Sequence, residues 1–182
     1  KQHNIPTASY EVFDDPAKAL SYIEQKNEYP VVIKADGLAL GKGVIIAADH
    51  DEAKEGLKEI MEDKVFGASG NQVVVEEFLT GPEVSVLAFV DGKTVVPMVS
   101  SMDHKRALDG DKGLNTGGMG TVAPNPYYTP EVAQQCMERI FLPTVKAMQE
   151  MGRPFKGCLY FGLMITSKGP YVIEYNCRFG DP

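Results

Sequence analysis

The sequence predicts an α+β fold built from two lobes. Segments with strand periodicity lie before and after segments with helical periodicity, and successive strands are joined by short connections, as in antiparallel sheets. The Asp91-Gly92 pair between two apolar runs is a strong hairpin signal. We place the lobe boundary near Phe78 to Gly81, so the predicted lobes are residues 1–78 and 79–182.

The first lobe is expected to contain two helices. Residues 14–27 (DDPAKALSYIEQKN) start with acidic residues, carry Pro16 in the first turn and continue with apolar residues at helical spacing. Residues 51–66 are amphipathic, with Glu–Lys pairs on the outer face. The residues expected to face inward from this second helix are Leu57, Ile60 and Met61.

A glycine-rich stretch with a lysine near each end separates two predicted strands, residues 30–35 (PVVIKA) and 43–49 (GVIIAAD). It is not a P-loop, G-x-x-x-x-G-K-[ST], because Asp36 stands where the first glycine belongs. In addition, Gly43 follows Lys42 where Ser or Thr is required, and a strand follows where a P-loop opens a helix. The stretch is therefore a glycine-rich turn between two strands.

The second lobe is expected to be mainly β-structure with one long helix. After the hairpin, residues 100–125 form a polar, glycine-rich segment without periodicity, and loops this long in compact domains are often functional. A Thr-Pro pair predicts the start of a helix over residues 129–152, with a bend near Pro143. Two last strands are predicted over residues 156–167 and 170–178, joined by a turn.

Composition limits the classes of function. A net charge of -7 argues against a nucleic-acid binder or an anionic-membrane binder, although a polyphosphate ligand needs only a local basic cluster. No run approaches 18 apolar residues and no secretory signal leads the chain, so neither a membrane span nor export is expected. Three widely spaced cysteines without a C-x-x-C motif argue against a disulfide framework or a zinc site, and fit reduced thiols in the cytoplasm.

The strand over residues 170–178 carries the sharpest chemical signal. Alternation places Glu174, Asn176 and Arg178 on one face, opposite Tyr175. Carboxylate and amide oxygens suit Mg²⁺, which takes one or two protein ligands together with phosphate oxygens and water. An arginine on the same face could hold a phosphate or a carboxylate. An ordinary half-solvated strand shows the same alternation, so this pattern alone leaves both interpretations open.

Two glutamates flank the predicted lobe boundary. Glu76 belongs to a strand predicted over residues 72–79 (QVVVEEFL). Glu83 begins the next strand and shares a face with Ser85, opposite Val84. Such carboxylates could accept hydrogen bonds from an adenine amino group and from ribose hydroxyls, and exposed glutamates beside a turn are the alternative.

The order of these motifs resembles the ATP-grasp superfamily, whose two lobes enclose ATP between antiparallel sheets. The motifs are a lysine-bearing strand, a glycine loop, E-E-F-L followed by a further glutamate, and E-x-N-x-R. Over essentially the whole chain the sequence is similar to the glycinamide ribonucleotide synthetase (phosphoribosylamine–glycine ligase) family, in the segments IPTASYEVF, KADGLALGKGV, EEFLTGPEVSV, DHKRALDGDKGLNTGGMG and EYNCRFGDP. The fourth segment is the most specific, because relatives such as biotin carboxylase and D-alanine ligase do not carry it.

This resemblance implies a role for each motif residue. Lys34 would reach the α- and β-phosphates of ATP, and the glycine loop would close over the γ-phosphate. Mg²⁺ (or Mn²⁺) would be bound by Glu174 and Asn176, and the catalytic residues would be Arg178 and Lys42. The ATP-binding residues implied are Lys34, Gly41, Lys42, Gly43, Glu76, Glu77, Phe78, Leu79 and Glu83. The substrate-binding residues implied are Asp103, Lys105, Arg106, Asn115, Thr116, Gly117 and Gly118.

Members of this family use ATP to phosphorylate the carboxylate of glycine, and the amine of 5-phosphoribosylamine then displaces phosphate, in de novo purine biosynthesis. The resemblance therefore implies an ADP-forming ligase with ATP and Mg²⁺, two small-molecule substrates and no nucleic-acid or membrane partner. A monomer in the cytoplasm is expected. The chain begins without an initiator Met and stops directly after its most function-like strand. We therefore expect a fragment that lacks N- and C-terminal domains and is incomplete as a catalyst.

One position departs from the superfamily pattern. Many ATP-grasp enzymes place a second acidic metal ligand on the strand before the last, whereas Gly162 takes that position here, so the number of metal ions stays open. Another ATP-grasp ligase, with a different carboxylate and amine, is one alternative, and only residues 103–120 discriminate it. A non-catalytic ATP-binding module is the other. For Lys105 and Arg106, a solvated basic pair is the alternative to substrate binding.

Overall fold

The computed structural model describes residues 2–37, 39, 43–104, 106–110, 112–116 and 118–179, and at residues 106, 114 and 115 the backbone only. The chain divides into two compact units. The small unit consists of residues 8–79, and the large unit of residues 1–7 and 80–182. The first seven residues therefore lie with the large unit and not with the predicted lobe 1–78. They are bound to the large unit through Val172, whose N–H donates to the carbonyl of Pro6 at 2.8 Å.

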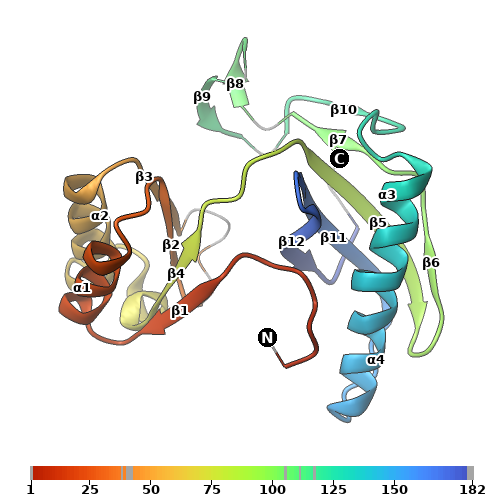
Figure 1. The fold of residues 1–182 in the computed structure, drawn as a ribbon, viewed down its shortest axis with the longest axis horizontal. Helices are drawn as coiled ribbons and strands as arrows, with labels where there is room; N and C mark the ends of the chain where they lie inside the picture. The colour runs from red at the N-terminus through yellow and green to blue at the C-terminus, as the bar shows by residue number, and fades with distance from the viewer. Residues whose placement is uncertain are drawn as a thin grey trace. The chain divides into compact units, whose positions relative to one another are not determined.

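The small unit is a four-stranded antiparallel sheet with two helices packed on it (Figure 1). Its strands are β1 (Tyr10–Phe13), β2 (Val31–Ala35), β3 (Val44–Ala47) and β4 (Val73–Glu77), in the spatial order β1-β4-β2-β3. Its helical segments are α1 (Pro16–Lys26), α2 (His50–Leu57), the π-helical turn η1 (Lys58–Glu62) and the 3₁₀ turn η2 (Gly67–Asn71). The three predicted strands are confirmed, and β1 is an additional edge strand.

The helices of the small unit start as the sequence predicts. Asp15 caps α1 by accepting hydrogen bonds from two backbone N–H groups of the first turn, at 2.8 and 3.1 Å. The helix predicted over residues 51–66 is shorter, because the regular helix stops at Leu57 and the π-helical turn stops at Glu62. The residues predicted to face inward are buried, as expected: Leu57, Ile60 and Met61.

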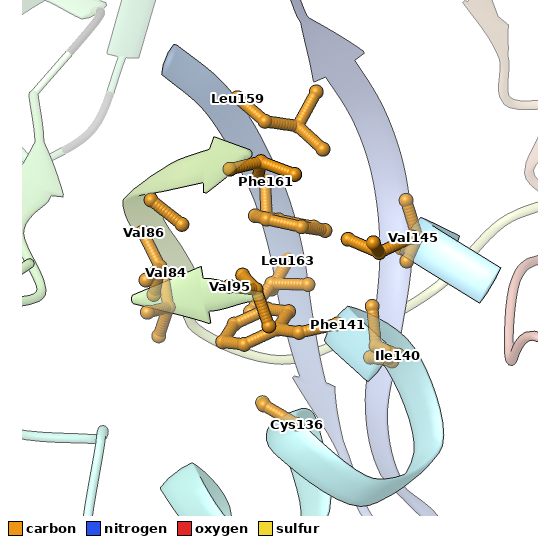
Figure 2. Packing of buried hydrophobic residues seen from close by; sticks show 13 residues of the cluster. Val84, Val86, Val95, Cys136, Ile140, Phe141, Val145, Leu159, Phe161 and Leu163 are labelled. Atoms are coloured by element: carbon orange, nitrogen blue, oxygen red, sulfur yellow. The ribbon is translucent and has the colours of Figure 1, made fainter. Parts of the chain in front are cut away.

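The large unit is a second four-stranded antiparallel sheet with a helical layer on one face (Figure 1). Its strands are β5 (Glu83–Asp91), β6 (Val95–Pro97), β11 (Lys156–Thr166) and β12 (Gly169–Asn176), in the order β12-β11-β5-β6. The helical layer consists of α3 (Pro130–Cys136), the π-helical turn η3 (Met137–Phe141) and α4 (Leu142–Glu150). Figure 2 shows the core between them, where Val86 and Phe161 of the sheet pack with Phe141 and Val145 of the helical layer.

The bend predicted near Pro143 takes the form of the π-helical turn η3. Pro143 has no N–H, so it cannot donate to the carbonyl of Arg139 four residues earlier, and its ring crowds that carbonyl. The helix accommodates this by widening over Met137–Phe141, a turn that ends two residues before the proline. Helical residues therefore continue through the proline instead of stopping at it.

The segment predicted to lack regular structure, residues 100–125, contains short strands. These are β7 (Met102–Asp103), β8 (Arg106–Leu108), β9 (Lys112–Asn115) and β10 (Thr121–Val122). β7 pairs with β10 and β8 pairs with β9, in both cases antiparallel. Figure 1 shows the β8–β9 pair projecting from the sheet of the large unit. The prediction is wrong here, because pairs this short and rich in glycine carry no detectable periodicity.

Candidate functional site

Lys34 and Glu76 form an ion pair on the outer face of the small unit's sheet. The register of β2 and β4 pairs Val32 with Glu76, and Lys34 follows two residues later on the same face. The Nζ atom of Lys34 lies 2.6 Å from Oε2 of Glu76, and the two side chains are 27% and 20% exposed. The pair thus presents a lysine ammonium whose direction is set by a neighbouring carboxylate.

The next predicted nucleotide-binding residue, Glu77, lies on the opposite face of β4 from Glu76. Its carboxylate accepts hydrogen bonds from the N–H and the hydroxyl of Ser9, at 3.2 and 2.9 Å. Glu77 therefore ties the end of β4 to the segment before β1. Phe78 is 38% exposed and Leu79 is half-buried. Of the two β4 glutamates, Glu76 shares a face with Lys34 and Glu77 does not.

The glycine-rich loop is closed at its base by a backbone hydrogen bond. The N–H of Ala35 donates to the carbonyl of Gly43 at 2.9 Å. A Cβ atom on Gly43 would lie 2.6 Å from the Cβ atom of Ala39, so only glycine allows this close approach. Two predicted phosphate-loop residues, Gly41 and Lys42, lie outside the described residues.

The large unit carries the second group of candidate residues on the face of its sheet that points away from the helical layer, which we call the open face. On β5, Val84, Val86 and Ala88 are buried in the core against the helical layer. Strand alternation therefore directs Glu83 and Ser85 to the open face, as the sequence predicts. Glu83 is exposed there, whereas Ser85 is 8% exposed.

Glu174 and Asn176 of β12 also lie on the open face. Their cross-strand partners on β11 are Gly162 for Glu174 and Tyr160 for Asn176. Gly162 pairs in turn with Ser85 of β5. The hydroxyls of Ser85 and Tyr160 lie 2.9 Å apart and form a hydrogen bond. The carboxylate and the amide thus stand beside a hydrogen-bonded pair of hydroxyls on adjacent strands.

A β-bulge sets the direction of Glu174. The register of β11 and β12 shifts between Gly162 and Leu163, which leaves Ile173 as an extra residue on β12. If the earlier register continued, Glu174 would lie opposite Phe161, which is fully buried in the core. The bulge places Glu174 opposite Gly162 instead, on the open face.

The bulge also lets residues on both sides of it face the helical layer. Val172, before the bulge, is buried. Tyr175, after it, donates its hydroxyl to Thr144 at 2.9 Å, and the Thr144 hydroxyl donates to the carbonyl of Ile140 at 2.7 Å. Tyr175 is 40% exposed, and partial desolvation raises the pKa of its hydroxyl above the ordinary value of 10, so the hydroxyl is protonated at neutral pH as in any tyrosine. The predicted opposition of Glu174 and Tyr175 is confirmed.

Arg178 lies beyond the end of β12. The strand stops at Asn176, so the prediction that alternation places Arg178 on the same face as Glu174 and Asn176 is wrong. The guanidinium donates from Nη1 to the carbonyl of Phe179 at 2.8 Å. This arginine is exposed and held by its own neighbour in the chain, not by the sheet.

The predicted substrate-binding residues belong to the short strands of the large unit. Asp103 lies in β7, and Arg106 and Asn115 are cross-strand partners in β8 and β9. The hydroxyl of Thr116 accepts a hydrogen bond from the N–H of Gly118 at 3.1 Å. A Cβ atom on Gly118 would lie 3.4 Å from Oδ1 of Asp103, so β7 and the turn after β9 lie close together. Two further predicted residues lie outside the described part of the chain: Lys105 and Gly117.

The open face fits a hard divalent cation that completes its coordination from a ligand. Within the described ranges, no group of three or more His, Cys, Asp or Glu residues could hold a metal. Glu174 and Asn176 offer one carboxylate and one amide on the same face of one strand. Mg²⁺ and Mn²⁺ accept such oxygen donors, and Mg²⁺ commonly binds through one or two carboxylates plus phosphate oxygens.

Two residues beside the candidate site were missed in the sequence. Tyr160 borders Asn176 on the open face, and Ser9 holds Glu77. Tyr160 could have been found from the sequence, because strand alternation along residues 156–167 puts it on the same face as Gly162. The role of Ser9 depends on the pairing of β1 with β4, which the local sequence pattern does not predict.

Solved enzyme structures have a fold similar to that of this chain. The chain resembles the biotin carboxylase domain of 2-oxoglutarate carboxylase from Hydrogenobacter thermophilus, solved with the magnesium salt of ADP, with a TM-score of 0.72. At 20% identity, covering 98% of this chain and 37% of that one, this likeness concerns the fold. A family model that matches the whole chain shows that the protein is an ATP-grasp domain.

The family model described as the phosphoribosylglycinamide synthetase ATP-grasp (A) domain matches residues 1–182, and the chain belongs to this family. It is 52% identical over 182 residues to a phosphoribosylamine–glycine ligase of Clostridium acetobutylicum, covering 100% of this chain and 44% of that protein. The crystal structure of phosphoribosylamine–glycine ligase from Thermotoga maritima matches with a TM-score of 0.90 at 39% identity, covering 100% of this chain and 46% of that chain.

The chain thus spans less than half the length of these relatives. In the part of the chain that the structure describes, no helix has the length and apolar character needed to cross a membrane.

Proposed function

We propose that the full-length protein containing this chain is an ADP-forming ligase that joins glycine to 5-phosphoribosylamine. The observation that carries the proposal is the family match over residues 1–182, which includes every candidate site residue. Relatives from Clostridium acetobutylicum and Neisseria meningitidis, at 52% and 53% identity, bear the name phosphoribosylamine–glycine ligase. The chain covers 44% and 43% of those proteins, so the activity is proposed for the full-length protein.

The small unit would supply the nucleotide-binding residues. Lys34 would bind the α- and β-phosphates of ATP, because its ammonium is already directed over the outer face by Glu76. Glu76 and the backbone of Phe78 and Leu79 would receive adenine, and Glu83 of the large unit would bind the ribose. The glycine loop, with Lys42, would cover the γ-phosphate and exclude the water that would hydrolyse an acyl phosphate.

The open face of the large unit would hold the cation. Glu174 would provide a charged oxygen and Asn176 a neutral one to Mg²⁺ or Mn²⁺. When bound, such an ion offsets the negative charge of the phosphates during phosphoryl transfer. Arg178, exposed just beyond β12, would donate to the phosphoryl group, which requires it to leave the carbonyl of Phe179.

The proposed reaction consists of two substitutions. A carboxylate oxygen of glycine attacks the γ-phosphorus of ATP, and the bond from that phosphorus to the bridging oxygen breaks, which gives glycyl phosphate and ADP. The amine nitrogen of 5-phosphoribosylamine then attacks the acyl carbon, phosphate leaves with the electron pair of the carbon–oxygen bond, and the nitrogen loses a proton. Phosphorylation is needed because the charge of a free carboxylate repels the amine. The segment from Asp103 to Gly118 would face glycine or the ribose 5-phosphate.

The test is ADP release by the full-length protein. We expect ADP and phosphate in equal amounts only when ATP, glycine and 5-phosphoribosylamine are all present. Glu174→Gln keeps the size of the side chain and removes its charge, so we expect Mg²⁺-dependent turnover to be lost while the melting temperature is kept.

Two results would overturn the proposal. ADP release with a different amino acid or amine, and none with glycine, would identify another ATP-grasp ligase. ATP binding without ADP release for any substrate would identify a non-catalytic ATP-binding module.

We also propose that the protein acts as a monomer in the cytoplasm. The cytoplasm is supported by the three cysteines, which are free thiols and suit a reducing compartment. Light scattering on the full-length protein should give the mass of a single chain, and a mass of two chains would reject the monomer.

A further inference from the structure

Gly162 occupies an unusual place for a glycine. It lies inside β11, the strand bordered by β5 on one side and β12 on the other, and it is buried. Its backbone does not have the positive φ that favours glycine. Glycine inside a strand lowers stability, and it often marks a point where another group must approach closely. Backbone conformation therefore does not explain why position 162 is glycine. The explanation must come from the side chains around it.

The group that approaches Gly162 is the side chain of Glu174. A Cβ atom on Gly162 would lie 2.7 Å from Cγ of Glu174 and 3.5 Å from its Oε1. It would also lie 3.2 Å from Cε1 of Tyr160. Cβ atoms essentially never come within 3.0 Å of a heavy atom outside their own residue and its chain neighbours, so any larger residue would displace Glu174. The Glu174 side chain thus lies back across β11, over the space that a side chain at 162 would fill.

Two features of the chain produce this arrangement together. The bulge at Ile173 turns Glu174 from the core to the open face and sets it opposite Gly162. The missing side chain at 162 then leaves room for the Glu174 side chain over β11, in a space that the ring of Tyr160 borders. That ring is held in place, since its hydroxyl is hydrogen-bonded to Ser85 at 2.9 Å.

We propose that Gly162 is a positioning residue, which acts by leaving room for the Glu174 carboxylate to lie across β11 in the direction required for the cation. This inference rests on the proposed function, because it takes Glu174 as a metal ligand. It also gives a reason for the glycine at the position where many ATP-grasp enzymes carry a second acid. In this chain the space is taken by the one carboxylate that comes from β12.

The first test measures metal binding in the full-length protein. Mn²⁺ is titrated in the presence of ADP, and free Mn²⁺ is followed by electron paramagnetic resonance. We expect Gly162→Ala to weaken Mn²⁺ binding by about tenfold or more, as is typical when a group that orients a metal ligand is altered. Cys158→Ala is the matched control, since it lies on the same strand and the same face, opposite Phe89, and should leave Mn²⁺ binding unchanged.

The second test asks whether the contact is steric, without any metal. The melting temperature is measured for Gly162→Ala, for Glu174→Ala and for the double variant. We expect Gly162→Ala to lower the melting temperature when Glu174 is present, and to lower it much less when residue 174 is alanine, because the clashing Cγ atom is then absent. Equal losses in both backgrounds would overturn the inference.

The two tests separate failure of this inference from failure of the proposed function. If Glu174→Ala weakens Mn²⁺ binding and Gly162→Ala does not, the positioning role is rejected and the metal assignment stands. If Glu174→Ala itself leaves Mn²⁺ binding unchanged, the metal assignment is rejected, and the purpose proposed for Gly162 is rejected with it.

Discussion

The Lys34–Glu76 pair shows how a single residue of this protein is prepared for a ligand. Both side chains keep some exposure, so the pair itself adds only about 0–1 kcal/mol to the free energy of unfolding. Its value lies in direction, because the carboxylate holds the ammonium over β2 and β4. A phosphate oxygen placed there would find a donor that has already lost much of its rotational freedom.

Lys34→Met keeps most of the length of the side chain and removes its charge. We expect kcat/KM for ATP to fall about 100-fold, since a preorganised donor is typically worth on the order of 3 kcal/mol in the transition state. The measurement is steady-state ADP release by the full-length protein. Lys18→Met, at an exposed lysine of α1, is the control and should change nothing. A Lys34→Met protein with the kcat/KM of the unsubstituted protein would remove Lys34 from the phosphate site.

At the residue scale, sequence patterns could predict which face of a strand a side chain lies on, but not which side chain it contacts. Motif and alternation point to Lys34 and Glu76 separately, yet their contact depends on the register of β2 with β4, strands that are far apart in the chain. The same alternation already implies that Glu77 faces away from Glu76, although its bond to Ser9 is visible only in the structure. Glu174 points outward as predicted, but for a reason that the sequence does not show, namely the bulge at Ile173.

Among the elements, α1 and α2 of the small unit are linked by one histidine. His50, the first residue of α2, lies with Nε2 2.9 Å from Oε1 of Glu24 in α1. Its Nδ1 lies 3.2 Å from Oδ1 of Asp51. The protonated imidazole donates to both carboxylates, and these hydrogen bonds, chiefly the one to Glu24, raise the pKa of His50.

This raised pKa makes the stability of the small unit depend on pH. Because the folded-state pKa of His50 is above its unfolded value of 6.5, the link contributes fully below that pH and is lost as pH rises through the folded-state pKa. We expect the melting temperature to fall with rising pH above neutrality, and to fall less in His50→Gln. Glu24→Gln should reduce the same dependence. Identical pH profiles for His50→Gln and the unsubstituted protein would show that the link contributes nothing.

At the element scale, the predictable parts are those with strong local chemistry. The Asp15 cap locates α1, and Pro143 locates the irregular turn η3. β1 was not predicted, because it is a short edge strand whose residues do not alternate between buried and exposed. The strands of residues 100–125 were not predicted because each is only two to four residues long. Both depend on pairing partners and not on their own periodicity.

For the whole molecule, the main physical fact is that the two units have separate cores. The hydrophobic cluster of the small unit includes Ile33, and that of the large unit includes Ile140. The two clusters share no residue, and both isoleucines are fully buried. Each unit therefore has its own hydrophobic source of stability.

Matched substitutions in the two cores test this independence. Ile33→Val and Ile140→Val each remove one buried methylene group and should lower the free energy of unfolding by about 0.5–1.5 kcal/mol. In hydrogen exchange followed by mass spectrometry, we expect faster exchange only in the unit that carries the substitution. Faster exchange in both units from either substitution would show that they open as one cooperative structure.

The path of the chain between the units has a consequence for synthesis on the ribosome. Residues 8–79 complete the small unit as soon as they emerge, so this unit can fold early. The residues before it cannot, because the hydroxyl of Thr7 bonds at 2.8 Å to the carbonyl of Val172, which is made 165 residues later. Residues 1–7 therefore pair late although they precede the small unit in the chain, and the small unit forms as an insertion within a large unit that still lacks β12.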